Sequence, residues 1–268
     1  MIPLEDNFND ILGKAIKGLG LSEAAAAQAS GLSSEAVRRL LAGDFEETAA
    51  RALAQALALQ PDALVEMARG EYQPLVTVPD ALATLTTTFG DMTVNAYVVW
   101  DRENRAAAIF DTGAEAGPIL DLVRREALEV VSIFLTHSHA DHIAALGALQ
   151  AALDVEAWSS ELEPVRGTRT FRPGDVFNVG RHFLRTRLTP GHSPGGVTFI
   201  VEGHTVQAAM VGDAIFAGSA GGIRGDYAAS LATIRHEILG LPDSTILCPG
   251  HGPLTTVALE AAHNPFFA

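Results

Sequence analysis

The spacing of apolar residues divides the chain into a helical beginning and a longer part in which strands and helices alternate. Residues 1 to about 70 are rich in Ala, Leu and Glu and poor in β-branched residues, a composition that favours helix. Glycines break this stretch into short helices, and serines stand where N-terminal caps are needed. Helices are predicted to begin at Ser22 and to cover residues 35–41, 46–59 and 61–68.

Strand-like apolar runs follow a proline-containing linker at residues 71–79. The run at 130–136 is mostly apolar, which is typical of a strand buried on both faces. Strands are predicted at 94–100, 106–110, 130–136, 183–188, 197–201, 206–211 and 245–248, and helices at 119–127, 143–153 and 228–239. Interleaved strands and helices indicate an α/β layered domain, so we divide the chain into a helical domain at 1–72 and an α/β domain at 73–268.

Composition narrows the classes of partner and compartment. The chain has 268 residues, of which 48% are hydrophobic, and a formal net charge of −14 at pH 7. An acidic surface repels phosphate backbones and acidic membrane leaflets, so neither nucleic acid nor membrane is an expected partner. The single cysteine, Cys248, excludes an intrachain disulfide and fits a reducing compartment. No leader peptide or bilayer-spanning stretch is visible, so a cytoplasmic protein is expected.

The helices on either side of Gly31 resemble the helix-turn-helix of Cro/repressor-like domains, over residues 12–67. A helix that reads DNA needs positive charge, but the second helix offers only Arg38 and Arg39. Residues 1–70 carry six Lys or Arg against ten Asp or Glu. We therefore expect these helices to serve packing, dimerisation or the covering of a site. A DNA-binding regulator with a metal-dependent sensor domain stays an alternative.

Seven potential metal ligands stand out in the α/β part, four of them within six residues. Each group follows a predicted strand, and loops at strand ends bring distant side chains together on a rigid scaffold. Asp141 and His142 fall at the start of the next helix, where the helix dipole favours a carboxylate. Adjacent glycines let the backbone turn sharply beside an ion. The seven residues are His137, His139, Asp141, His142, His192, Asp213 and His251.

The number of ligands indicates two ions. Seven ligands are too many for one tetrahedral ion, but they suit two divalent ions that share a bridging carboxylate and a bridging hydroxide. Zinc is the expected metal, and iron and manganese accept the same ligand types. Cys248 is expected to be a buried residue at a strand end rather than a ligand or a reactive thiol. The remaining histidines are expected to be structural or exposed: His182, His204, His236 and His263.

The motif His-x-His-x-Asp-His, with its downstream His, Asp and His, resembles that of the metallo-β-lactamase superfamily over residues 73–268. The resemblance implies a four-layer αββα fold, preceded here by a small all-α domain. Asp111-Thr112-Gly113 matches an aspartate turn early in the family's sequences. The resemblance also implies that Asp213 bridges two ions, the first held by His137, His139 and His192 and the second by Asp141, His142 and His251.

Three stretches resemble the glyoxalase II-like hydrolases: residues 189–196, 212–219 and 249–253, the last with the tail 264–266. This resemblance implies a binuclear hydrolase whose metal-bridging hydroxide attacks an ester or thioester carbonyl, with no separate protein nucleophile. The chain is expected to lack the helical extension that binds glutathione in the larger glyoxalase II enzymes, so no substrate is assigned. Gly221-Gly222 stands where that pattern often has Gly-Arg, with Arg224 displaced.

The chain also resembles persulfide dioxygenases, which use a mononuclear iron site. Its ligands here would be His137, His192 and Asp213, but the arginine expected beside the bridging aspartate is missing. A small-molecule substrate is the expected partner in either case. A second copy of the chain, bound through the N-terminal helices, is left open.

Overall fold

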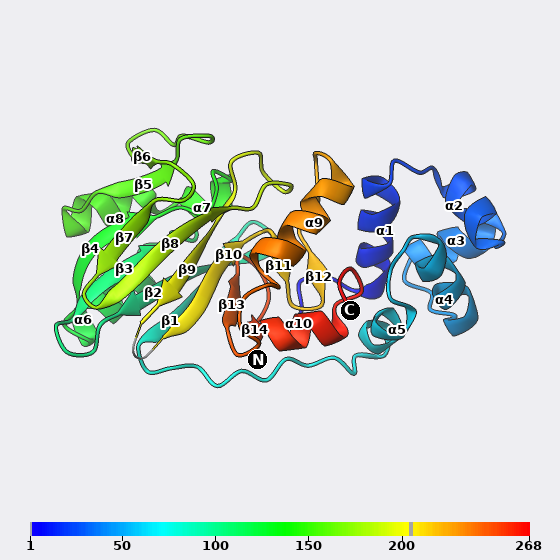
Figure 1. Cartoon of the computed structure of the whole chain (residues 1–268), viewed down its shortest axis with the longest axis horizontal. Coiled ribbons are helices and arrows are strands. Elements are labelled where there is room, and N and C mark those ends of the chain that lie inside the picture. Colours follow the sequence, from blue (N-terminus) through cyan, green and yellow to red (C-terminus); the bar gives the residue numbers. More distant parts are fainter. Residues whose placement is uncertain (1, 204–205) are drawn as a thin grey trace.

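The computed structural model describes residues 2–203 and 206–268, and it begins with a group of short helices (Figure 1). The predicted serine caps are present, since Ser22 Oγ accepts the Ala25 N–H at 3.2 Å and Ser33 Oγ accepts the Ala36 N–H at 3.1 Å. The turn between the two capped helices contains Gly31 in the left-handed conformation, with φ of 71°. The helices are α1 (Phe8–Gly18), α2 (Glu23–Ser30), α3 (Ser34–Leu41), α4 (Glu47–Ala56) and α5 (Pro61–Arg69).

Two mixed sheets follow. The first contains β1 (Leu82–Phe89), β2 (Met92–Trp100), β3 (Ala106–Phe110), β4 (Glu129–Phe134), β5 (Ala157–Ser160) and β6 (Arg169–Phe171), in that spatial order. The second contains β7 (Val176–Val179), β8 (His182–Leu188), β9 (Val197–Glu202), β10 (Gln207–Gly212), β13 (Ile246–Pro249) and β14 (Thr255–Thr256). Its spatial order is β14-β13-β10-β9-β8-β7. A separate hairpin joins β11 (Ile215–Phe216) to β12 (Ser219–Ala220).

Aromatic side chains fill the space between the two sheets. Phe199 of the second sheet lies 5.5 Å from Phe110 and 5.4 Å from Phe134 of the first, measured between ring centroids. Phe177 lies 4.9 Å from Phe134 in an edge-on arrangement. Aromatic pairs at these separations stabilise a core beyond the area that they bury.

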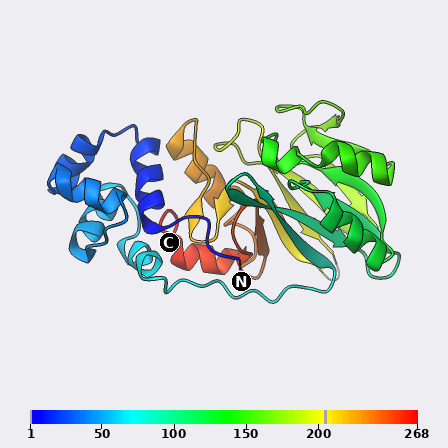
Figure 2. The same cartoon turned by 180° about the vertical axis from the view of Figure 1, so that it is seen from behind.

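Helices cover the outer side of each sheet (Figures 1 and 2). Ile119 of α6 (Gly117–Arg125) and Leu149 of α8 (Leu146–Leu153) belong to the core of the first sheet. Ile234 of α9 (Tyr227–Glu237) packs with Val211 of the second sheet, beside α10 (Val257–His263). The prediction of a four-layer αββα arrangement is confirmed.

The N-terminal helices share one apolar core with the second sheet. Leu12 of α1 and Leu53 of α4 lie in the same buried cluster as Val211 of β10 and Phe267 near the C-terminal end. This buried cluster contains residues from both sides of residue 72. It does not test the division of the chain into two domains, which stays a prediction. None of the helices in the described part of the chain is long and apolar enough to cross a membrane.

One prediction about the first sheet is wrong. The strand predicted at 130–136 is β4, but its first half is not buried on both faces, and Val131 is 39% exposed. The partner strand β5 begins only at Ala157, which pairs with Ile133. The residues of β4 before Ile133 therefore lie at a free sheet edge.

The ends of the sheets opposite the predicted ligands are joined by Asp101, which is 1% exposed. Its carboxylate accepts hydrogen bonds from the Arg181 backbone N–H and guanidinium, each at 2.9 Å. The hydrogen bonds from Arg181 hold the pKa of Asp101 below its ordinary value of 3.8. This carboxylate thus ties the turn between β2 and β3 to the turn between β7 and β8.

The Asp101→Asn variant is expected to lower the melting temperature by several degrees at pH 7, because the buried side chain loses its charge-assisted hydrogen bonds. A lowered folded-state pKa gives stability that is present above 3.8 and is lost as the pH falls toward the folded-state value. The difference from the unchanged protein should therefore narrow below about pH 4. Thermal unfolding at pH 7 and pH 3 measures it. Glu202→Gln, which removes an exposed ion pair with Arg185, is the control and should have little effect.

Candidate metal centre

All seven predicted ligand residues lie in loops or in the short helix at one end of the two sheets. His137 follows β4, His192 follows β8, Asp213 follows β10 and His251 follows β13. Asp141 and His142 lie in α7 (Ala140–Ile143), so the predicted helix start is confirmed. Two groups have ligand atoms that all lie within 4.8 Å of one another: His137, His139, His192 and Asp213 form the first, and Asp141, His142 and His251 form the second.

The Asp213 carboxylate lies between these two groups. Its Oδ2 is 3.3 Å from His192 Nε2 of the first group and 3.4 Å from His251 Nε2 of the second. Its Oδ1 is 3.3 Å from His142 Nε2. The structure therefore brings together every residue that the sequence analysis named and leaves one carboxylate in contact with both groups.

Glycine is required beside Asp213. A Cβ built on Gly250 would lie 2.1 Å from Asp213 Oδ1 and 2.5 Å from His142 Cε1. A Cβ on Gly212, which has φ of 51°, would lie 2.5 Å from Thr136 Oγ1. Side chains larger than hydrogen at these positions would push the ligand groups apart.

Hydrogen bonds at Nδ1 orient the imidazoles of His142 and His251 in the second group. His142 Nδ1 lies 2.9 Å from Asp111 Oδ2, and His251 Nδ1 lies 2.6 Å from the Thr93 carbonyl oxygen. Because both partners accept hydrogen bonds, each Nδ1 carries a proton, and Nε2 is the nitrogen that can bind a metal ion once its own proton has left. Asp111 and Thr93 were not recognised as functional in the sequence. Only the match of the Asp111 turn to the family pattern pointed to the first of them.

Several buried atoms of the site have no hydrogen-bond partner within the described residues. Among the seven residues of the site they are His137 Nε2, His142 Nε2, His192 Nδ1 and Asp213 Oδ1. Buried polar atoms nearly always have a partner, so an unpaired set that converges on one point indicates a missing ligand. Imidazole nitrogens and carboxylate oxygens are suitable ligands for divalent metal ions. The donor set therefore fits metal ions.

The pKa values of the histidines differ between the two groups. Burial disfavours a charged imidazole, and it lowers the pKa of His137 to about 3. For His142 burial acts in the same direction, but the carboxylates of Asp213 and Asp111 outweigh it and raise the pKa to about 10. Burial likewise opposes charge on His251, whose hydrogen bonds to Asp141 and Asp213 raise its pKa to about 11. Metal binding in the second group therefore has to displace protons.

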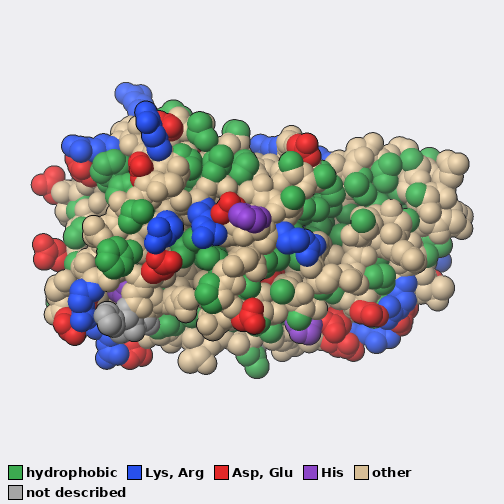
Figure 3. Space-filling model, in the orientation of Figure 1, with side chains coloured by type: hydrophobic (Ala, Val, Ile, Leu, Met, Phe, Trp, Pro, Cys, Tyr) green, Lys and Arg blue, Asp and Glu red, His purple; other side chains and the backbone are tan. Residues whose placement is uncertain are grey.

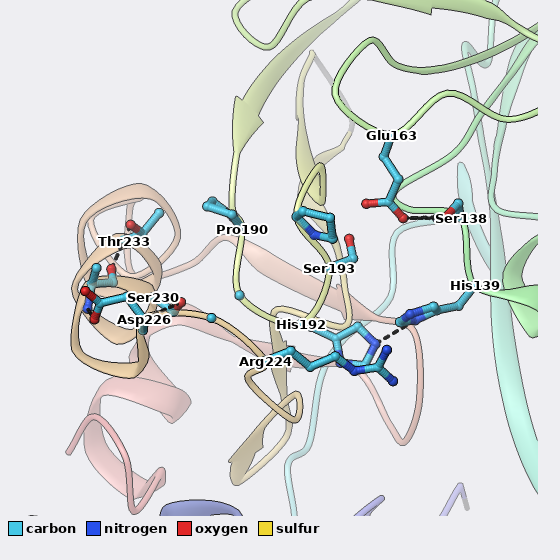
Figure 4. Close-up of a pocket in the computed structure, with 14 residues that line it drawn as sticks. Ser138, His139, Glu163, Pro190, His192, Ser193, Arg224, Asp226, Ser230 and Thr233 are labelled. Atoms are coloured by element: carbon cyan, nitrogen blue, oxygen red, sulfur yellow. Dashed lines mark hydrogen bonds between the residues drawn. The ribbon is translucent and has the colours of Figure 1, made fainter. Parts of the chain in front are cut away.

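A cleft of about 730 Å³ opens beside the first group. Figure 4 shows His139, His192 and the Arg224 side chain close together at its wall. Glu163 fixes the loops on this side, since its carboxylate accepts the N–H groups of Ser138 at 2.8 Å and Gly195 at 2.9 Å. The role of Glu163 could not be recognised from the sequence, because its contacts join residues far apart along the chain.

The histidines outside the site behave as expected where they are described. His182 is buried, with Nε2 at 3.1 Å from the Trp100 carbonyl oxygen, and His236 is exposed. His263 Nδ1 lies 2.8 Å from Glu66 Oε2, and His204 lies outside the described residues. The prediction that Cys248 is a buried strand-end residue is confirmed, and burial raises the pKa of its thiol.

Proteins with known sequences share the part of the chain that carries the site. The chain is 32% identical to a Bacillus subtilis protein named Probable metallo-hydrolase YqgX, over 66% of this chain and 93% of that protein. It is 33% identical to Hydroxyacylglutathione hydrolase GloC of Haemophilus influenzae, over 64% of this chain and 92% of that protein. It is 32% identical to the human mitochondrial Persulfide dioxygenase ETHE1, over 63% of this chain and 69% of that protein.

A solved structure and a family model agree with these relatives. The crystal structure of BLEG-1 B3 metallo-beta-lactamase is 32% identical, covers 69% of this chain and 100% of its own chain, and gives a TM-score of 0.57. The family model described as the Metallo-beta-lactamase superfamily matches residues 89–251, which include all the predicted ligands. Together with the His and Asp cluster, these matches show that the chain belongs to the metallo-beta-lactamase superfamily of metallo-hydrolases.

Proposed function

We propose that the protein is a binuclear metal-dependent hydrolase that cleaves an ester or thioester. The contact of Asp213 with both ligand groups carries this proposal, because a carboxylate shared by two complete groups suits two neighbouring ions. Two divalent ions held there would supply a water activated at neutral pH and a Lewis acid for the carbonyl oxygen. Zinc is the proposed metal, with iron and manganese as alternatives.

The chain's own residues would hold and orient the site. His137, His139 and His192 would bind one ion, and Asp141, His142 and His251 the other, with Asp213 shared. The cleft beside His139 and His192 gives a carbonyl compound access to the first group. Cys248 is buried away from the solvent, which supports a reaction without a cysteine nucleophile. The relative named hydroxyacylglutathione hydrolase supports the ester or thioester class.

A mononuclear iron dioxygenase is the second candidate. It is favoured by the relative named persulfide dioxygenase and by the two-His, one-carboxylate set of His137, His192 and Asp213 within the first group. The second group weighs against it, because Asp141, His142 and His251 also converge with their ligand atoms within 4.8 Å of one another.

Elemental analysis of protein purified without added metal, combined with thioester, lactone and persulfide assays, tests the proposal. We expect two ions per chain and thioester or lactone hydrolysis. One iron per chain, with oxygen uptake on a persulfide, would overturn it in favour of the dioxygenase.

His139→Ala removes a ligand of the first group and is expected to lower turnover about 100-fold or more, as the loss of a transition-state stabilising group does. His236→Ala, an exposed histidine, is the matched control and should keep both metal and activity.

We also propose that the N-terminal helices do not read DNA. The two arginines of α3 are paired with acids, since Arg38 lies 2.9 Å from Glu35 and Arg39 lies 2.6 Å from Asp44. On the face seen in Figure 3, the basic side chains at the helical end lie beside acidic ones. Sequence-selective DNA binding that weakens steeply with salt would support the regulator alternative instead.

A further inference from the structure

The segment from Asp213 to Tyr227 links the shared carboxylate to the wall of the cleft. It carries the β11–β12 hairpin and then a glycine-rich stretch, residues 221–225, which includes the cleft-lining Arg224. A Cβ built on Gly222 or Gly225 would meet nothing within 4 Å. The stretch therefore has little side-chain packing of its own, and glycine gives its backbone more freedom than any other residue would.

Helix α1 holds this segment at its first end. The Lys14 ammonium donates a hydrogen bond to the Ala220 carbonyl oxygen at 2.8 Å and pairs with the Asp6 carboxylate. Asp6 in turn accepts a hydrogen bond from Ser219 Oγ at 2.6 Å. The same ammonium lies 5.0 Å from the ring centroid of Phe216. A partly buried ion pair thus fixes both strands of the hairpin to α1.

The same helix holds the second end of the segment. A Cβ built on Gly18, the last residue of α1, would lie 2.2 Å from Tyr227 Cδ2. The aromatic ring of Tyr227, the first residue of α9, therefore lies directly against the backbone of α1 at Gly18. Figures 1 and 2 both show α1 beside α9 and the hairpin.

Movement of this segment would reach the metal ligands. A Cβ on Gly221 would lie 1.8 Å from the Asp213 carbonyl oxygen and 3.3 Å from His192 Cβ, so the backbone there packs directly on both ligand residues. The Arg224 N–H also donates to the Gly191 carbonyl oxygen at 2.9 Å, next to His192. Since interiors are close-packed, a shift at residues 220–224 has to move these neighbours.

We propose that α1 is part of the scaffold of the metal centre, with Lys14 and Gly18 as positioning residues for the segment 213–227. The N-terminal helices lie outside the region that the family model matches, residues 89–251, so this role is an addition to the shared fold. This proposal goes beyond the hydrolase function. Only the KM and kcat measurements in its test rest on that function.

The test compares two glycines of the same helix in the full-length, metal-loaded protein. Gly18→Ala places a methyl group against Tyr227, whereas Gly13→Ala places one where nothing lies within 4 Å. Gly18→Ala is expected to raise hydrogen–deuterium exchange in residues 219–226 about tenfold and the thioester KM about tenfold, with a smaller fall in kcat. Exchange in the first sheet should stay unchanged, and Gly13→Ala should behave like the unchanged protein.

A second variant keeps the proposal testable where Gly18→Ala does not fold. Lys14→Met keeps the apolar stem but loses the ion pair, and we expect the same local rise in exchange, with recovery in Lys14→Arg. Unchanged exchange in residues 219–226, or an equal rise in the first sheet, would overturn the positioning role. Absence of thioester hydrolysis by the unchanged protein would instead count against the proposed function, and the exchange data would still decide the role of α1.

Discussion

Replacing Asp213 with asparagine is expected to lower turnover of a thioester by about 10³-fold, equivalent to about 4 kcal/mol of activation free energy. The asparagine side chain has the same shape, but it carries no charge and only one oxygen. Asp213 uses both carboxylate oxygens, Oδ1 toward His142 and Oδ2 toward His192 and His251. One change therefore weakens both ligand groups, which no other single substitution among the seven does.

Metal content gives the direct measurement. We expect the unchanged protein to retain two ions per chain after dialysis and Asp213→Asn to retain at most one, with little recovery of activity on addition of excess metal. Asp243→Asn makes the same chemical change at an exposed position and is the matched control. Two tightly held ions in Asp213→Asn would contradict the assignment of Asp213 as the shared ligand.

The cluster of His and Asp residues could be predicted from the sequence because its signal is local. Four of them lie within residues 137–142, and the other three each follow an apolar strand in a turn marked by glycine or proline. A buried strand, a sharp turn and a polar side chain are adjacent along the chain, so their arrangement follows from short-range rules.

The parts that were not predicted depend on long-range contacts. Strand β1 was missed because four of its eight residues are threonine, which gives a weak apolar alternation, and it becomes a strand by pairing with β2. The Thr93 carbonyl oxygen that orients His251 is a backbone atom and carries no sequence signal at all. Nothing in the sequence distinguishes Glu163 from a surface acid. Its role comes from the fold, which places its carboxylate against the loops of Ser138 and Gly195.

The packing of the N-terminal helices was also beyond the sequence. Their amphipathic spacing predicts helices but not the surface that they cover. Leu12 and Leu53 could equally have met a second copy of the chain, and only the structure shows them packed with Val211 of the second sheet. The helix-turn-helix resemblance stays a prediction, whereas the contacts of Lys14 and Gly18 connect α1 to the segment 213–227.

Asp111 is the residue outside the ligand set whose substitution should have the largest effect. Its Oδ2 lies 2.9 Å from His142 Nδ1 and accepts a hydrogen bond from Thr136 Oγ1 at 2.7 Å. Thr136 Oγ1 is in turn 3.0 Å from His137 Nδ1. Since the threonine proton points to Asp111, its oxygen accepts the His137 Nδ1 proton. One carboxylate therefore orients an imidazole in each of the two groups.

Asparagine is the informative replacement because the backbone of Asp111 has φ of 54°, a conformation that Asn and Asp tolerate better than other residues with a side chain. Any effect then comes from the changed hydrogen bonds and the lost charge rather than from strain. The amide has one oxygen and one NH2 group, and the Thr136 backbone N–H, at 2.8 Å from Oδ1, already requires an acceptor. The NH2 group is left facing His142 Nδ1, which favours the tautomer with its proton on Nε2 and removes the lone pair that a metal needs.

Asp111→Asn is accordingly expected to weaken binding of the second ion about 10- to 100-fold, the range typical of lost orienting contacts. Competition with a chelator measures this affinity. Because the ligands themselves remain, activity should be restored by excess metal, unlike that of Asp213→Asn. Asp154→Asn is the matched control, since Asp154 has φ of 53° and is exposed at the end of α8. Unchanged affinity in Asp111→Asn would mean that the imidazoles are oriented by the metal ions alone, and the hydrogen-bond chain from Asp111 to His137 would then have no role in metal binding.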